Sequence, residues 1–98
     1  MTDHLPYRLK LRSWLPLLTG HDCITIGSTI YCRKSSLHRH TVAHEYCHVM
    51  QWRRYGVVGF LWRYLVEQLR HGYQGNRFEL NAHAYADAHE TEFADVGR

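Results

Sequence analysis

The sequence has no Cys-x-x-C pair and no long unbroken apolar run, and a signal peptide is not expected. Without a Cys-x-x-C pair among only three cysteines, a structural zinc site built from cysteines is not expected. The most apolar stretch, residues 57–69, is interrupted by Arg63, Glu67 and Gln68 and is too short to span a bilayer. Residues 1–10 are polar and of mixed charge, without the apolar centre of a signal peptide. These absences predict a protein with no membrane span, and a cytoplasmic location is the default expectation.

Strong charge of one sign is also missing. Twelve Lys and Arg against nine Asp and Glu give a formal net charge of +3, and the basic residues are scattered. A nucleic-acid partner is therefore not expected. The 98 residues suffice for one small domain, and its core will be small, so a bound metal ion would add useful stability.

One motif with a defined chemistry is present: residues 44–48 read His-Glu-Tyr-Cys-His, an H-E-x-x-H. In a helix His44 and His48 lie one turn apart on one face, where a single metal ion can bind both imidazoles. Glu45 lies about 100° around the same helix, close enough to reach a water molecule on that metal. This is the zincin arrangement of two histidine ligands and a glutamate that acts as general base.

The residues around the motif predict an amphipathic helix from near Leu37 to Tyr55, with Gly56 as its C-terminal stop. Ser35, Ser36 or Thr41 could cap its start. The face opposite His44 and His48 is apolar and is expected to pack against the core; it contains Val42, Ala43, Tyr46, Cys47, Val49 and Met50.

Residues 23–32 are rich in β-branched side chains and have Gly-Ser at their centre, which predicts a β-hairpin. Gly27 suits the first central position of a type II′ turn. This register places Cys23 opposite Cys32, whereas a three-residue loop would pair Cys32 with Ile24. Two free thiols are the simpler expectation, and a disulfide between Cys23 and Cys32 is the alternative.

The rest of the chain completes an α+β prediction: a single zincin-like domain, residues 1–98, with a short β-hairpin or small antiparallel sheet and three helices. Residues 1–20 are expected to be irregular, with one helical turn near Ser13, and residues 93–98 to form a frayed tail. A second helix is expected over residues 57–69 and a third over residues 77–92, capped by Asn76. The apolar stripe of the second helix is expected to face the core or a partner; it contains Phe60, Leu61, Tyr64, Leu65 and Leu69.

A catalytic zinc needs a third protein ligand, and Glu79 is the favoured candidate. It begins the third helix directly after a glycine-containing loop that could bring it back to the motif, although it could instead serve as a capping-box acid. His83 is the alternative ligand, while Glu67 is expected to be exposed. His83 and Asp87 share the face of Glu79 and could support a ligand or contact substrate. His40, one turn before His44, is expected to be exposed or to support a ligand.

The H-E-x-x-H at residues 44–48, followed by Asn-Arg-Phe-Glu at residues 76–79, resembles the gluzincin clan of zinc metallopeptidases, which includes thermolysin. The short length is similar to that of the minigluzincins. Thr-Ile-Gly at residues 25–27 and Gly-Tyr at residues 72–73 are also similar to short bacterial proteins that carry these motifs. The resemblance implies one zinc ion per chain, bound by His44, His48 and Glu79.

The expected function is hydrolysis of a peptide or protein substrate, with Glu45 as the general base. The donor that stabilises the oxyanion is left open among Tyr73, His83 and Tyr85. The resemblance further implies that an edge strand within residues 24–31 holds an extended peptide. The alternative is a zinc-stabilised protein-binding or regulatory module that cleaves nothing.

Overall fold

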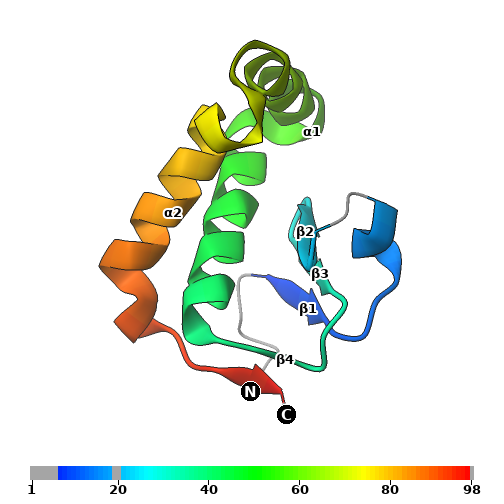
Figure 1. The fold of residues 1–98 in the computed structure, drawn as a ribbon, viewed down its shortest axis with the longest axis vertical. Helices are drawn as coiled ribbons and strands as arrows, with labels where there is room; N and C mark the ends of the chain where they lie inside the picture. The colour runs from blue at the N-terminus through cyan, green and yellow to red at the C-terminus, as the bar shows by residue number, and fades with distance from the viewer. Residues whose placement is uncertain (1–6, 19–20, 98) are drawn as a thin grey trace.

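The computed structural model describes residues 7–18 and 21–97. A long helix, α1 (Arg39–Gly75), lies at the centre, with a small sheet on one side and α2 (Arg77–His89) on the other (Figure 1). The sheet has the order β1-β3-β2. The shorter elements are β1 (Arg8–Lys10), η2 (Leu15–Leu18), β2 (Cys23–Ile26), β3 (Thr29–Cys32), β4 (Ser36–Leu37), η3 (Glu90–Glu92) and β5 (Val96–Gly97).

The hairpin of β2 and β3 has the predicted register, with Cys23 opposite Cys32. Both cysteines are free thiols. Gly27, at the turn, has a φ of 62°, which a glycine adopts without strain. The prediction for the hairpin is therefore confirmed.

The ends of the chain are more ordered than expected. The prediction of an irregular N-terminal segment missed β1, which pairs in parallel with β3, so the sheet is mixed rather than purely antiparallel. The helical turn expected near Ser13 begins two residues later as η2, and the Ser13 hydroxyl accepts a bond from the Leu15 N–H. The expected frayed tail contains β5, which pairs with β4. Residues 1–6, 19–20 and 98 lie outside the described part.

The core lies between the sheet and the first part of α1. Ile30 and Cys32 project from β3 onto Val42 and Val49 of α1, and all four side chains are buried. Burial of large apolar side chains contributes about 1.5–3 kcal/mol each. The side of the motif helix opposite the two histidines thus packs as predicted, which fixes the helix against the hairpin.

The prediction of three helices is wrong: the described residues form two α-helices. The first, α1, continues past Gly56 to Gly75. Gly56 and Gly72 have non-helical φ/ψ values, and the chain bends at these glycines without forming a separate loop. Its N-cap is His38, whose Nδ1 accepts a bond from the His40 N–H, and not one of the hydroxyl residues proposed as caps. No helix in the described ranges is long and apolar enough to cross a membrane.

The second part of α1 differs from expectation at Glu67, which was expected to be exposed. It is buried and accepts bonds from the Arg77 N–H at 3.1 Å and the Arg77 guanidinium at 3.0 Å. Of the apolar stripe, Phe60 is buried in the core, whereas Leu61, Leu65 and Leu69 are between 52% and 78% exposed. The bend at Gly56 causes this difference, since it rotates residues 57–69 so that Phe60 and Glu67 face inward.

Gly56→Ala is expected to lower the free energy of unfolding by about 1–3 kcal/mol, because φ 74° and ψ 171° lie in a region that only glycine occupies readily. No atom lies within 4 Å of an added Cβ, so the cost is backbone strain alone. Gly59→Ala, at a helical position on the same segment, is the control. There the added Cβ would lie 3.4 Å from the Arg63 guanidinium and 3.7 Å from Cβ of Tyr55, which are ordinary contacts, and alanine should stabilise by up to about 1 kcal/mol. Chemical denaturation measures both, and equal effects would contradict the proposed strain.

Candidate metal centre

His44, His48 and Glu79 converge on one point although 31 residues separate His48 from Glu79. The Nε2 atoms of both histidines lie 3.2 Å from the same oxygen, Oε1 of Glu79. All three side chains are buried, and their ligand atoms lie within 4.8 Å of one another. This buried group could hold a metal ion.

The second ring nitrogen of His48 is already occupied. Nδ1 of His48 lies 2.8 Å from Oε1 of Gln51, and the Gln51 amide donates to the Phe78 carbonyl at 3.0 Å. Since the glutamine oxygen can only accept, Nδ1 carries the hydrogen and Nε2 keeps its lone pair in the neutral ring. A histidine ligand of a metal is commonly held in this way.

Glu79 is held by two tyrosines as well as the two histidines. The Tyr64 hydroxyl donates to Oε2 of Glu79 at 2.6 Å, and the Tyr73 hydroxyl donates to Oε1 at 3.3 Å. Burial and the neighbouring Glu79 raise the pKa of Tyr73 to about 12, and burial likewise raises the pKa of Tyr64, so both hydroxyls keep their protons. Tyr64 thus aims the carboxylate at the two imidazoles.

The charges in this group suit a cation. Burial alone would raise the pKa of Glu79, but its hydrogen bonds with His44 and His48 hold that pKa below the ordinary value. Burial would lower the pKa of His48, but the bond with Glu79 raises it. The partners found for Glu79 among the described residues include no Lys or Arg. A divalent ion would therefore neutralise a buried carboxylate and replace the proton that the imidazole otherwise holds.

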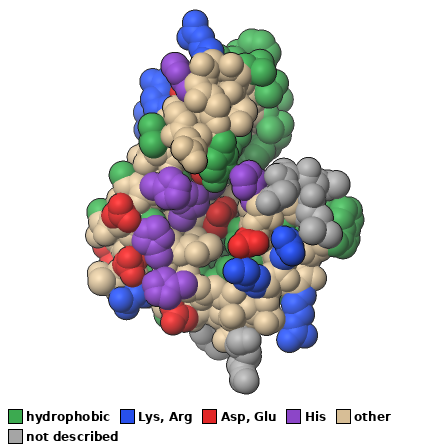
Figure 2. Space-filling model, viewed as in Figure 1, with side chains coloured by type: hydrophobic (Ala, Val, Ile, Leu, Met, Phe, Trp, Pro, Cys, Tyr) green, Lys and Arg blue, Asp and Glu red, His purple; other side chains and the backbone are tan. Residues whose placement is uncertain are grey.

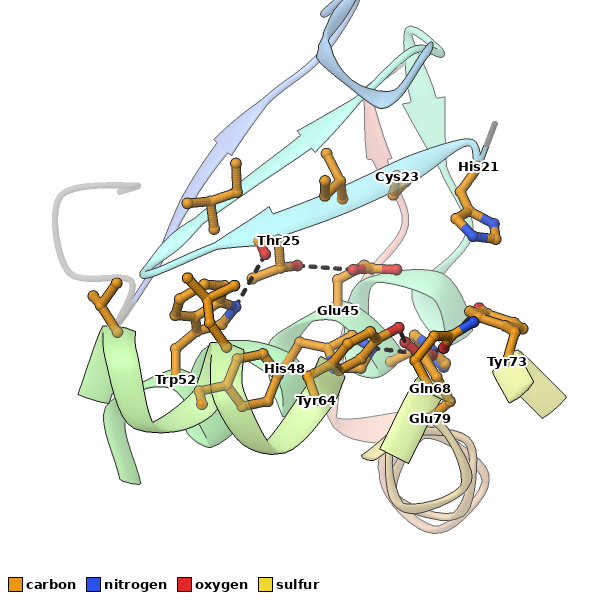
Figure 3. A pocket seen from close by; sticks show the side chains of 16 residues that line it. His21, Cys23, Thr25, Glu45, His48, Trp52, Tyr64, Gln68, Tyr73 and Glu79 are labelled. Atoms are coloured by element: carbon orange, nitrogen blue, oxygen red, sulfur yellow. Dashed lines mark hydrogen bonds and ion pairs between the residues drawn. The ribbon is translucent and has the colours of Figure 1, made fainter. Parts of the chain in front are cut away.

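Glu45 lies beside the ligands, on the side that faces β2 (Figure 3). Its side chain is buried, and Oε1 accepts a bond from the Thr25 hydroxyl at 2.8 Å. Thr25 belongs to the strand that packs on α1, so the hairpin fixes the rotamer of Glu45. Glu45 lines the same cavity as the metal group.

That cavity has a volume of about 550 Å³ and reaches from the ligands to the bend in α1. One end carries the polar groups, including a stack of His21 on Tyr73 with ring centroids 4.7 Å apart. The other end is apolar, and its walls come from β2 and both parts of α1; they are formed by Ile24, Ile26, Trp52, Val57, Phe60 and Leu61. Ligand sites commonly combine a few polar groups with such an apolar wall.

The remaining candidates are placed differently. Tyr73 lines the cavity, whereas His83 is exposed and lies outside its lining, with its ring centroid 4.4 Å from that of His44. Tyr85 stacks on His89. Nε2 of His40 lies 2.9 Å from Oδ1 of Asp87. Neither Tyr85 nor His40 belongs to the metal group. Figure 2 shows several histidines close together on this side of the molecule.

The sequence analysis missed Gln51, Tyr64 and Thr25 as supporting residues. Gln51 follows His48 by three positions, a helical neighbour on the same face, so its role could have been inferred from spacing. Tyr64 was assigned to an apolar stripe, and no local pattern shows that its hydroxyl reaches Glu79. The bond of Thr25 depends on how the hairpin packs on the helix.

If the group holds a metal ion, Tyr64→Phe is expected to weaken its binding about 10–100-fold, the usual cost of losing a group that orients a ligand. The ring stays packed near Phe78, so the metal-free fold should change little. Tyr55→Phe is the matched control, because that tyrosine lies on the same helix and also packs on Phe78, at 5.9 Å. Zinc titration against a competing chelator gives both affinities. Equal affinities for the two variants would show that Tyr64 does not orient the ligand.

Comparison with known proteins gives no match: no family model, no curated protein and no solved structure matches the chain. The assignment of a function therefore depends on the geometry of the site.

Proposed function

We propose that the chain is a zinc-dependent peptidase. The observation that carries the proposal is that Glu45 and the metal group His44, His48 and Glu79 line one cavity. Two histidines and one glutamate are a donor set of catalytic zinc, which keeps a fourth position for water, whereas structural zinc is closed by four ligands. A structural site would have no use for a carboxylate held beside it.

Zinc, when bound, would lower the pKa of a water molecule and polarise a peptide carbonyl. Glu45 accepts the proton of the attacking water and delivers it to the leaving amine. Its bond from Thr25 occupies one carboxylate oxygen and leaves the other for this transfer. Tyr73 is the one of the three candidate oxyanion donors that lines the cavity. To act in this role, its protonated hydroxyl must turn from Oε1 of Glu79, to which it donates at 3.3 Å, toward the oxyanion.

The substrate is a peptide that lies between β2 and the bent α1. β2 is an edge strand, which suits main-chain pairing with an extended peptide. The carbonyl of Thr25 already accepts a bond from the Trp52 indole at 3.0 Å, so it has one remaining lone pair for a peptide N–H. The apolar end of the cavity, walled by Trp52 and Phe60, would take a large apolar side chain.

Glu45→Gln is the test. The amide keeps the size and the acceptor oxygen for Thr25 but cannot take a proton, so hydrolysis should fall about 100–10,000-fold with zinc content unchanged. The zinc-loaded protein and the variant are compared on a library of quenched fluorescent peptides, with a chelated sample to identify metal-dependent cleavage.

The second candidate is the zinc-stabilised binding module without activity, favoured by the exposed apolar side of α1. It takes the place of the peptidase if the fully loaded unmutated protein cleaves no peptide. Cleavage that Glu45→Gln leaves unchanged would also remove the proposed mechanism.

A further inference from the structure

The second part of α1 has an outward side that no described residue covers. Four of its large apolar side chains are between 52% and 81% exposed and are here called the outer face: Val58, Trp62, Leu65 and Leu69. Figure 2 shows hydrophobic side chains gathered there, at the end of the molecule where the second part of α1 lies. We propose that two copies of this chain associate through this face.

The spacing along the outer face is that of a helix-pairing seam. Val58, Trp62, Leu65 and Leu69 follow one another at steps of four, three and four residues, the repeat of side chains that interlock between two helices. Phe60 and Glu67 point to the other side of the same helix and are buried in their own subunit. The seam is therefore free for a second helix.

The charge pattern favours a second copy over a charged partner. Residues 57–69 contain only two charged residues, Arg63 and Glu67, and Glu67 is buried, so a charged partner would find little opposite charge beside the outer face. An identical apolar face is self-complementary, as a two-fold interface requires. Arg63, on the flank, is turned back onto its own subunit: its guanidinium lies 4.8 Å from the centre of the Tyr55 ring and donates to the Gly59 carbonyl. It is therefore not aimed outward as a contact for anionic lipid.

The outer face would be the centre of the contact and not the whole of it. A stable complex buries about 800 Å² from each partner, so contact with the helix termini and flanks would supply the remainder.

The experiment measures the mass of the full chain in solution by light scattering after size exclusion, at several micromolar concentrations. The unmutated protein should have twice the chain mass of 11.7 kDa. Trp62→Glu and Leu65→Glu should give the chain mass, because each places a carboxylate in the seam. Trp14→Glu is the matched control, since Trp14 is 66% exposed and Trp62 67%, and it should remain dimeric.

A monomeric unmutated protein at every concentration would overturn the proposal, as would a dimer that survives both seam variants. If the protein is monomeric and binds anionic vesicles in a way that Trp62→Glu abolishes, the face is a lipid contact instead. Circular dichroism identifies a variant that fails to fold, and the mass of the unmutated protein then decides alone. None of these readouts depends on zinc or on peptidase activity.

Discussion

The double variant His44→Ala/His48→Ala will not retain zinc and will not be stabilised by it. The two imidazoles supply two of three ligands in a buried group whose third member, Glu79, would be left without its nitrogen partners. A ligand that binds only the folded state stabilises it by about 4 kcal/mol when its concentration is 1,000 times the dissociation constant. For a domain of this size that corresponds to a rise in Tm of roughly 15–30 °C.

Calorimetry with zinc and with chelator measures the difference for each protein. The unmutated protein should show the rise, and the double variant should show none. The control is His40→Ala/His71→Ala, which removes two imidazoles from the same helix but none from the metal group, and it should behave like the unmutated protein. The Tm of the metal-free double variant measures separately the stability that is lost when two buried histidines are replaced by alanine. Stoichiometric zinc in the double variant would refute the assignment.

Local patterns predicted the parts of this protein that depend on near neighbours in the chain. The four-residue spacing of His44 and His48 sets their common face, and Asn76 caps α2 by accepting the Phe78 N–H at 2.9 Å, as expected. The hairpin register follows from its two-residue turn. In each case the determining contact is within one turn of helix or one pair of strands.

The parts that were not predicted depend on distant partners. Pairing of β1 with β3 requires the N-terminal segment to lie beside a strand 21 residues further along the chain. Glu67 is buried because Arg77, at the start of the next helix, binds it. Gly56 was predicted to end the motif helix, but it has a positive φ and forms a bend within α1, where Phe60 packs on Trp52 with ring centroids 4.7 Å apart. Glycine permits that geometry without requiring it.

Glu79 was the least secure ligand from sequence, because the same residue could complete a capping box. The structure gives the cap to Asn76 alone, and the Glu79 carboxylate points away from the helix start toward His44 and His48. Capping and coordination predict different consequences when Glu79 is replaced by glutamine. A capping glutamate loses little as glutamine, whereas a ligand loses the negative charge that it offers to a dication.

Glu79→Gln is therefore expected to weaken zinc binding by more than about 100-fold, since loss of a merely supporting partner already costs about 10–100-fold. Glu67→Gln is the matched control, a second buried glutamate of similar exposure (8% against 6%), and it should keep the affinity of the unmutated protein. His83→Ala should also bind zinc nearly normally, because His83 is exposed and outside the metal group. Competitive zinc titration gives the three affinities. If Glu79→Gln binds like the unmutated protein while His83→Ala does not, His83 is the third ligand, and the carboxylate seen between the two imidazoles is only their hydrogen-bond partner.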